Sequence, residues 1–402
     1  MRTYQDVFRT PEFTPLFVTS TLQVAAVTVS GLALGTLVYA ATGSPLLAAL
    51  SMFGPSLARV LGAAVLLSAA DRVPPRTALA GLAAVSAAGT AVQAVPGLPL
   101  WVSFVVLLAL GALGSLGGGV RFGLLNQILA KDGYLLGRSV LNMAGGTMQI
   151  CGFAVGGVLL TVLSPRGTLL AGAALYAVSA VTARFGLAAR AARATGRPSV
   201  AATWRDNASL LASRPRRTVY LALWVPNGLI VGCESLFVPY SPHHAGLLFA
   251  CAAVGMLAGD TLTGRFVPAR LRERLAAPLR LLLAAPYLVF ALHPALPLAL
   301  VTVVLASVGY AASLMLQERL MELTPDELSG HALGLASTGT LAGQGFAAAL
   351  AGAVAERTSP TAAMATMSVL SVAVTLTLAP GLRPRRTAAA APAGTGADTV
   401  RP

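Results

Sequence analysis

Long apolar runs alternate with short clusters of charged and turn-forming residues along almost the whole chain. A membrane-spanning α-helix needs about 20 consecutive, mainly apolar residues, and these runs have about that length. We predict twelve spanning helices, with approximate bounds 16–40, 46–70, 77–95, 99–121, 139–163, 167–189, 218–240, 244–264, 276–293, 296–318, 330–354 and 360–380. The predicted fold class is therefore an all-α membrane protein.

A polar, Arg-rich stretch separates the sixth run from the seventh, and an Ala-, Pro- and Thr-rich tail follows the last run. Such tails bury too little apolar surface to fold. We predict four parts: an N-terminal six-helix bundle (1–189), a cytoplasmic basic linker (190–217), a C-terminal six-helix bundle (218–380) and a disordered cytoplasmic tail (381–402).

Composition supports lipid as the main environment. Of the 402 residues, 56% are hydrophobic and only 10% are charged, whereas soluble proteins carry about a quarter charged residues. The net charge of +14 could suggest nucleic acid, but the basic residues, all Arg except Lys131, lie mainly in the gaps between apolar runs. That pattern is typical of cytoplasmic loops, so we expect the lipid bilayer as a partner and no nucleic acid.

The distribution of Arg predicts the orientation in the membrane. With the N-terminus inside, only Arg166 and Arg357 fall outside, and Arg59 falls within a run. The other basic residues, including Arg280, which we count with the later cytoplasmic loops, fall on the cytoplasmic side. The excess of Ala, Gly and Arg favours a bacterium. We therefore expect a multi-pass protein of the bacterial cytoplasmic membrane with both termini cytoplasmic.

The two halves of the chain carry similar motifs. The second run is followed by Asp71 and, five residues later, Arg76; the eighth run ends with Asp260 and, again five residues later, Arg265. Transporter folds are commonly built from such repeats, with the substrate site between them. The repeat therefore favours a transporter with a central site.

Three segments resemble the major facilitator superfamily. Segment 71–76, Asp-Arg-Val-Pro-Pro-Arg, resembles its loop motif Gly-x-Leu-x-Asp-Arg-x-Gly-Arg-Arg, without the leading Gly and with Pro where the second Gly is usual. Segment 39–45, Tyr-Ala-Ala-Thr-Gly-Ser-Pro, resembles a bacterial exporter branch that includes siderophore and macrolide exporters, and segment 152–157 is similar to the small-residue motif of its antiporters. The resemblance implies two pseudo-symmetric six-helix bundles that rock around a central cavity.

Charged residues at the inner ends of the helices are candidates for a cytoplasmic gate. Asp71 can bind a nearby Arg or the positive N-terminus of the eleventh helix. In the family, such contacts lock the cytoplasmic gate in the outward-open state; the alternative is a solvated loop charge. The candidate gate and motif residues are Asp71, Arg72, Arg76, Arg121, Asp260 and Arg265.

Two charged residues inside runs are candidates for proton coupling. Arg59 lies mid-run, where an isolated Arg costs at least about 2.5–3.5 kcal/mol and usually faces a cavity or a partner. Glu234 lies in the outer half of the seventh run. We hypothesise that they pair when the outer gate closes and that protonation of Glu234 breaks the pair. The alternatives are a Glu234 hydrated near the outer headgroups and an Arg59 that reaches the interface.

Polar residues on several runs are candidates to line the substrate cavity. These are Gln23, Thr28, Asn142, Gln149 and Gln344. Asn142 and Gln149 are seven residues apart and so share a helix face. Hydrogen bonds between helices are an equally good explanation for such residues.

The leading functional hypothesis is a monomeric secondary transporter that exports a small hydrophobic or amphipathic compound in exchange for protons. We predict no enzymatic activity, cofactor or metal, because the three Cys have no CxxC spacing and no catalytic His/Asp arrangement or ATP-binding motif is present. The alternatives are a nutrient importer of the same fold, a facilitator that has lost coupling, and a non-transporting receptor or membrane-embedded enzyme.

Overall fold

The computed structural model describes residues 4–70, 73–129, 131–191, 200–325 and 328–382, and these residues form helices joined by short loops. The first half contains α1 (Tyr4–Phe8), α2 (Phe13–Thr42), α3 (Pro45–Ala70), α4 (Pro75–Gln93), α5 (Leu100–Ile128), α6 (Lys131–Val162) and α7 (Pro165–Gly186). The second half contains α8 (Val200–Ala212), α9 (Arg214–Ser235), α10 (Phe237–Tyr240), α11 (Ala245–Phe266), α12 (Ala269–Ala284), α13 (Leu296–Val308), α14 (Ala312–Glu322), α15 (Ser329–Arg357) and α16 (Pro360–Leu382). Two 3₁₀ helices, η1 (Ala285–Leu292) and η2 (Gly309–Ala311), interrupt this series.

Local sequence sets several helix ends. Helices α3, α4, α7 and α16 each begin at a Pro, whose fixed φ suits the first helical position and whose missing N–H is not needed there. Helix α2 ends at Gly43, which has φ 65° and donates its N–H to the carbonyl of Tyr39 at 2.8 Å. Gly takes this left-handed conformation without steric strain, so the chain reverses within a short turn before α3.

Ten helical segments of the described chain are long and apolar enough to cross a membrane. The predicted runs 77–95 and 330–354 are also largely helical, as α4 and α15, but are not among these ten. The basic stretch 190–217 contains one short helix, α8, and the start of α9. The tail from residue 383 lies outside the described residues. The multi-pass all-helical prediction is confirmed, and the number twelve stays a prediction.

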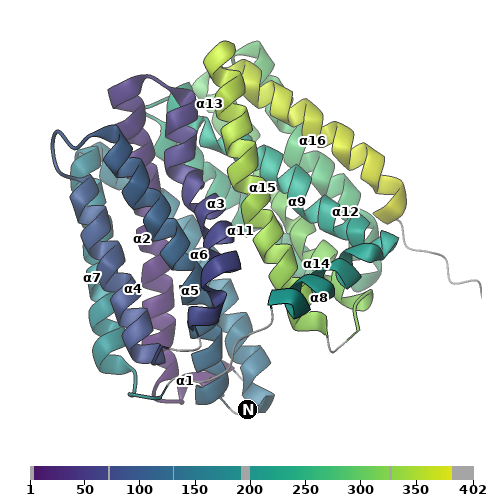
Figure 1. Ribbon diagram of the computed structural model, residues 1–402. Helices are drawn as coiled ribbons and strands as arrows, with labels where there is room; N and C mark the ends of the chain where they lie inside the picture. Colours follow the sequence, from purple (N-terminus) through teal and green to yellow (C-terminus); the bar gives the residue numbers. More distant parts are fainter. Residues whose placement is uncertain (1–3, 71–72, 130, 192–199, 326–327, 383–402) are drawn as a thin grey trace, which may run out of the picture.

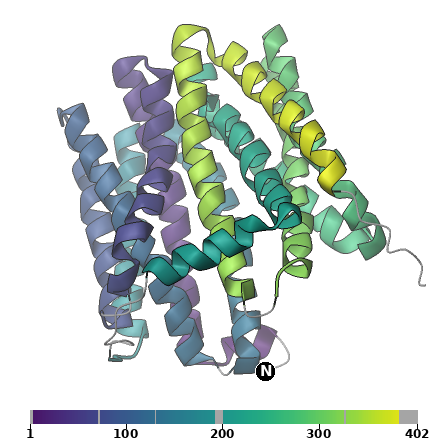
Figure 2. The ribbon, with the colours of Figure 1, turned by 45° about the vertical axis from the view of Figure 1, so that its right-hand side comes forward.

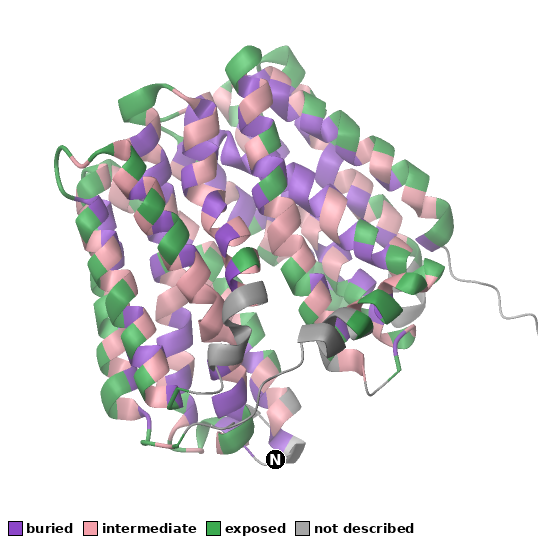
Figure 3. Cartoon of the chain, in the orientation of Figure 1, coloured by how far each residue is buried: buried purple, intermediate pink, exposed green. Residues whose placement is uncertain are grey.

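The outward-facing surface of the helices carries large apolar side chains. Trp101, Val162, Phe185 and Leu292 are each between 70 and 80% exposed, and Figure 3 shows exposed positions along the outer helices. A soluble protein rarely leaves so much apolar surface in water. Lipid contact explains these side chains.

The long helices form two groups, shown from two sides in Figures 1 and 2. The N-group, α2–α7, packs chiefly through α2 with α7, α3 with α5 and α4 with α7; the C-group, α9–α16, packs chiefly through α9 with α15 and α16, and α11 with α13. The groups meet through α3 with α15 and α6 with α11. Helix α8 contacts α9 and α15 of the C-group. Each half of the chain thus packs mainly on itself and touches the other chiefly along two helix pairs.

The C-group contains a close helix contact that the sequence did not predict. A Cβ on Gly309, the first residue of η2, would clash with the backbone of Leu279 and Leu283 in α12. The absence of a side chain therefore lets the two backbones touch. A 3₁₀ segment inside a helix commonly marks strain or a hinge, and this one places Tyr310 against α12.

Helix α12 also corrects one assignment. Arg280 does not lie in a cytoplasmic loop; it is 0% exposed inside the C-group. Its segment, Arg274–Leu292, is one of the ten candidate spans. The assignment was wrong because counting by charge places an Arg outside the membrane by default, whereas a partly polar bundle interior can hold one.

Outside the spans, one ion pair ties the start of α2 to the end of α7. Both Nη atoms of Arg190 donate to the Glu12 carboxylate, the second at 2.6 Å, and the Ala188 N–H donates to it at 3.1 Å. These donors, Arg190 first, lower the pKa of Glu12 below its ordinary value. The ion pair therefore closes the N-group at the end that carries the chain's N-terminus.

We expect Glu12→Gln to lower the melting temperature at neutral pH by about 1–2 °C, because an ion pair that keeps some contact with solvent contributes little. Because the folded pKa of Glu12 is depressed, its contribution is present above the ordinary carboxyl pKa and is lost as the pH falls through the folded pKa. The difference between wild type and variant should thus vanish on acidification, as thermal unfolding followed by tryptophan fluorescence measures. Glu322→Gln, at an exposed helical pair with Arg319, is the control; an equal effect there contradicts the assignment.

Candidate functional site

The two groups of helices hold each other at the end near the α2–α3 turn, here called the junction end. The Tyr39 hydroxyl reaches the carbonyl of Pro239 at 3.5 Å, and the Ser44 hydroxyl donates to the Glu356 carboxylate. Deeper in the protein, the rings of Phe153 and Phe249 stack with centroids 4.6 Å apart. Each of these pairs joins the N-group to the C-group, so the junction end is closed.

Small residues bring the backbones together at the same end. A Cβ added to Gly157 of α6 would lie 2.5 Å from the Cα of Gly246 of α11. A Cβ on Gly352 of α15 would lie 2.7 Å from the Cα of Leu46 of α3. Real Cβ contacts are never so short, so these glycines are needed for the approach. The closed junction end therefore depends on glycine at two helix crossings.

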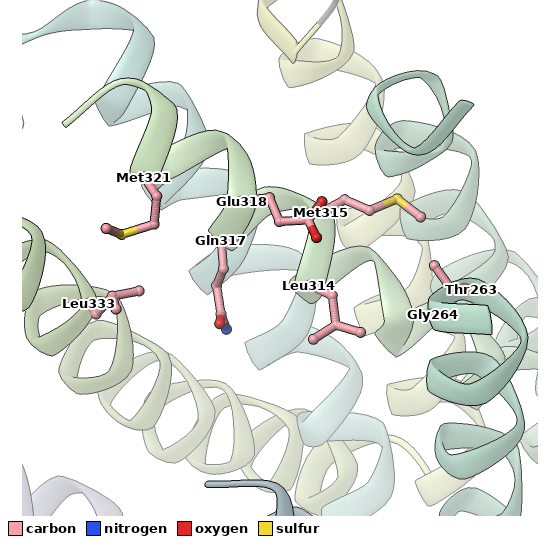
Figure 4. A pocket seen from close by; sticks show the side chains of 8 residues that line it. All are labelled: Thr263, Gly264, Leu314, Met315, Gln317, Glu318, Met321 and Leu333. Atoms are coloured by element: carbon pink, nitrogen blue, oxygen red, sulfur yellow. The ribbon is translucent and has the colours of Figure 1, made fainter. Parts of the chain in front are cut away.

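The groups diverge toward the opposite end, which carries the N-terminus (Figure 1). Thr263 lies 17 residues after Gly246 on α11, which is about 25 Å along a helix. Around it, between the ends of α11, α14 and α15, lies a pocket of about 310 Å³. In Figure 4 the Gln317 side chain points into the space between α14 and α15. The lining residues are Thr263, Gly264, Leu314, Met315, Gln317, Glu318, Met321 and Leu333.

A buried polar network lies inside the C-group. Glu234, at the end of α9, is 6% exposed and accepts a hydrogen bond of 3.0 Å from the Tyr310 hydroxyl. Arg280 interacts electrostatically with the same Tyr310, and its Nη2 donates to the Ser313 hydroxyl at 3.1 Å. Its Nε and Nη1 are buried without a hydrogen-bond partner. A carboxylate and a guanidinium thus share one tyrosine in a site with little access to water.

This network corrects the hypothesis about Glu234 and Arg59. The junction end, where the pair was expected to form on closure, is closed, yet Glu234 is bonded to Tyr310 and does not contact Arg59. Sequence reasoning missed Tyr310 and Arg280. The position of Arg280 within the apolar run 276–293 was the available signal; Tyr310 gave none, because aromatic residues are ordinary in spans.

Arg59 lies instead within the N-group. A Cβ on Gly114 of α5 would lie 3.5 Å from the Arg59 Nε, so the guanidinium lies over the surface of α5. The Arg59 Nε is buried without a hydrogen-bond partner, and Arg59 interacts electrostatically with Arg121, also on α5. The Arg121 guanidinium carbon is 4.9 Å from the centroid of the Phe122 ring. Arg59, predicted for proton coupling, and Arg121, predicted for the gate, therefore lie close to each other in the N-group.

The predicted gate motif is only partly described. Asp71 and Arg72 lie outside the described residues, and Arg76 is half-buried in the first turn of α4. Asp260 and Arg265 are exposed on α11 and form no ion pair with each other; the Arg265 guanidinium carbon is 5.9 Å from the centroid of Phe266. The gate role of these residues stays a prediction.

The predicted cavity residues have different environments. Gln344 donates to the Asn227 side chain at 3.0 Å, a contact between α15 and α9 within the C-group. Thr28 is buried, donates to the Val24 carbonyl at 2.8 Å and packs where Gly152 leaves space. These two therefore serve helix packing. Gln23 is half-buried on α2, whereas Asn142 and Gln149 are exposed on α6; their role in a cavity stays a prediction.

No family model and no curated protein matches this sequence. Solved structures do match it in fold. A POT family transporter in complex with a thioalcohol-conjugated peptide superposes with a TM-score of 0.72 at 11% identity, covering 92% of this chain and 96% of that one. The nucleoside transporter NupG gives 0.68 at 16%, covering 92% and 98%. A bacterial homologue of the human lysosomal transporter Spinster, inward-facing and unoccupied, gives 0.66 at 14%, covering 92% and 95%.

These similarities extend over nearly the full length of each chain. The protein therefore has a multi-pass, all-helical membrane fold like that of these transporters. At such identities the likeness defines the fold, and the function has to be argued from the site.

Proposed function

We propose that this protein is a secondary active transporter that works by alternating access, with twelve spans arranged as two bundles. The observation that carries the proposal is that the two helix groups contact each other closely at the junction end and diverge at the opposite end. A central site reached from one side at a time requires this asymmetry. The transporters that share the fold support the same conclusion.

Glu234 is the proton-binding residue in this proposal, with Tyr310 and Arg280 as the groups that control it. A buried carboxylate is costly unless charge or hydrogen bonds offset the lost hydration. Tyr310 supplies a hydrogen bond to Glu234, and Arg280 interacts electrostatically with the same tyrosine. If the transport cycle moves η2 away from α9 within the C-group, Glu234 loses its donor and takes up a proton. Transport and protonation are thereby linked.

The proposed direction is export of a small hydrophobic or amphipathic compound across a bacterial cytoplasmic membrane by a monomer. The support is the sequence resemblance to an exporter branch and the largely apolar spans. The proposal places both termini and the pocket at Thr263 on the cytoplasmic side. Asp71, Arg76, Asp260 and Arg265 then lie at the cytoplasmic ends of the helices, where they act as the gate.

A second candidate is uptake of a polar nutrient. The solved structures of similar fold favour it, because they include POT family transporters in complex with a conjugated peptide and with 5-aminolevulinic acid, and a nucleoside transporter. The same alternating-access cycle serves both directions, so only the transport assay decides between them.

Expression of the protein in a strain lacking its own exporters should raise tolerance to at least one compound in a panel of amphipathic toxins. A protonophore should abolish that tolerance, because the proton gradient drives the cycle. Tolerance is measured as growth across a concentration series. A vector-only strain and a strain expressing the Gly157→Val variant are the controls. Accumulation of labelled peptides or nucleosides, with unchanged tolerance throughout the panel, would show uptake in place of export. Absence of transport in both assays would overturn the proposed transporter function.

A further inference from the structure

The N-group holds two guanidiniums that have no counter-ion among the described residues. Arg59 of α3 and Arg121 of α5 each have a buried Nε without a hydrogen-bond partner. The two side chains interact electrostatically with each other and form no ion pair with a described carboxylate. Two like charges in a membrane-embedded bundle are unfavourable unless something neutralises them.

Backbone packing brings the two cations together. Gly111 of α5 faces the Pro55 backbone of α3, where a Cβ on Gly111 would lie 2.8 Å from the Pro55 carbonyl oxygen, and Gly114 faces the Arg59 guanidinium. Arg121 follows Gly114 by seven residues, so it lies on the same face of α5, about 10 Å further along. The close α3–α5 crossing therefore directs both guanidiniums along one surface.

A third polar side chain, the neutral Tyr176, lies near the Arg59 guanidinium. Tyr176 of α7 interacts electrostatically with Arg59, and its hydroxyl has no hydrogen-bond partner among the described residues. Arg59, Arg121 and Tyr176 all remain partly accessible rather than fully buried. The three side chains thus offer hydrogen-bond donors of positive overall charge to a molecule that enters the N-group.

We propose that Arg59, Arg121 and Tyr176 bind an oxyanion, a carboxylate or phosphate group, of the transported molecule. Guanidinium donates two parallel hydrogen bonds to either group, and its charge is worth most where water is excluded. The bound anion supplies the counter-charge that the described residues do not provide. This proposal rests on the proposed transport function and narrows its substrate to an amphipathic anion.

Equilibrium binding of two probes to the purified full-length protein in nanodiscs tests the site. The probes are radiolabelled benzoate, a carboxylate, and phenyl phosphate; neutral benzamide serves as competitor. Wild type should bind at least one anion saturably, with benzamide competing roughly tenfold less well or weaker. The relative affinity of benzoate and phenyl phosphate then identifies the oxyanion.

Variants test the residues. Arg59→Gln and Arg121→Gln should each weaken binding roughly tenfold or more, Tyr176→Phe should weaken it less, and Arg59→Lys should retain part of the affinity because it keeps the charge. Arg357→Gln, at an exposed Arg at the end of α15, is the control. Three results would each overturn the proposal. The first is benzamide that competes as well as the anions, and the second is wild-type affinity in both Gln variants when these remain monodisperse. The third is no binding of either anion to the wild type.

The binding assay does not depend on transport. Anion binding that requires Arg59 and Arg121, with no translocation in cells, leaves the site standing and removes the transporter function. Absence of anion binding, together with transport of uncharged compounds that is insensitive to Arg59→Gln, removes the site and leaves the function.

Discussion

Glu234→Gln is expected to reduce proton-driven transport roughly tenfold or more while leaving the exchange of substrate across the membrane near the wild-type rate. Gln has the size of a protonated Glu but cannot release a proton, so the cycle loses its coupling and keeps its conformational steps. The measurement uses proteoliposomes and the compound identified by the tolerance screen. Gradient-driven flux is compared with counterflow at equal pH on both sides.

Neighbouring variants distinguish coupling from damage to the fold. Tyr310→Phe removes the hydrogen bond that the Tyr310 hydroxyl donates to Glu234 and should shift the pH dependence of transport without abolishing it. Glu322→Gln changes an exposed carboxylate at the end of α14 and should behave as wild type. Unchanged gradient-driven flux in Glu234→Gln removes Glu234 from the coupling mechanism, whereas loss of both flux and counterflow assigns it a structural role.

Much of the fold could be read from the sequence because lipid imposes a simple rule. Backbone groups in hydrocarbon must be satisfied within the segment, so an apolar run of sufficient length is a helix. All twelve predicted runs are largely helical where described, and ten segments meet the criteria for a span. The helix ends at Gly43, Pro45 and Pro75 follow local rules as well. The hydrophobic pattern and the turn residues were sufficient to predict where the helices lie along the chain.

The partners of the buried charges could not be read in the same way. The contact of Glu234 with Tyr310 joins residues 76 positions apart, and it depends on Gly309, which lets η2 touch α12. No local signal specifies which helices cross there. Pairing Glu234 with Arg59 assumed a contact between the two halves, whereas each charge finds its neighbours within its own group. The residue types were identified correctly as unusual; their geometry required the structure.

Gly157→Ala is expected to hold the junction end open and to reduce transport roughly tenfold or more. The added methyl would meet the Gly246 backbone of α11 at 2.5 Å, and relief requires the two helices to separate. Overpacking of this kind costs about 1–3 kcal/mol, which lowers the equilibrium constant for closure by roughly five- to 150-fold. Cysteines at Ser44 and Glu356, which are hydrogen-bonded in the closed state, should then form a disulfide under mild oxidation much more slowly.

Gly146→Ala is the matched control, because it makes the same change on the same helix where a Cβ meets nothing within 4 Å. It should leave both the crosslinking rate and transport near wild type. Gly246→Ala approaches the contact from the other group and should reproduce Gly157→Ala, which separates an effect of the contact from an effect on α6 alone. Fast crosslinking and normal transport in both Gly157→Ala and Gly246→Ala would show that the junction end closes without the contact between Gly157 and Gly246.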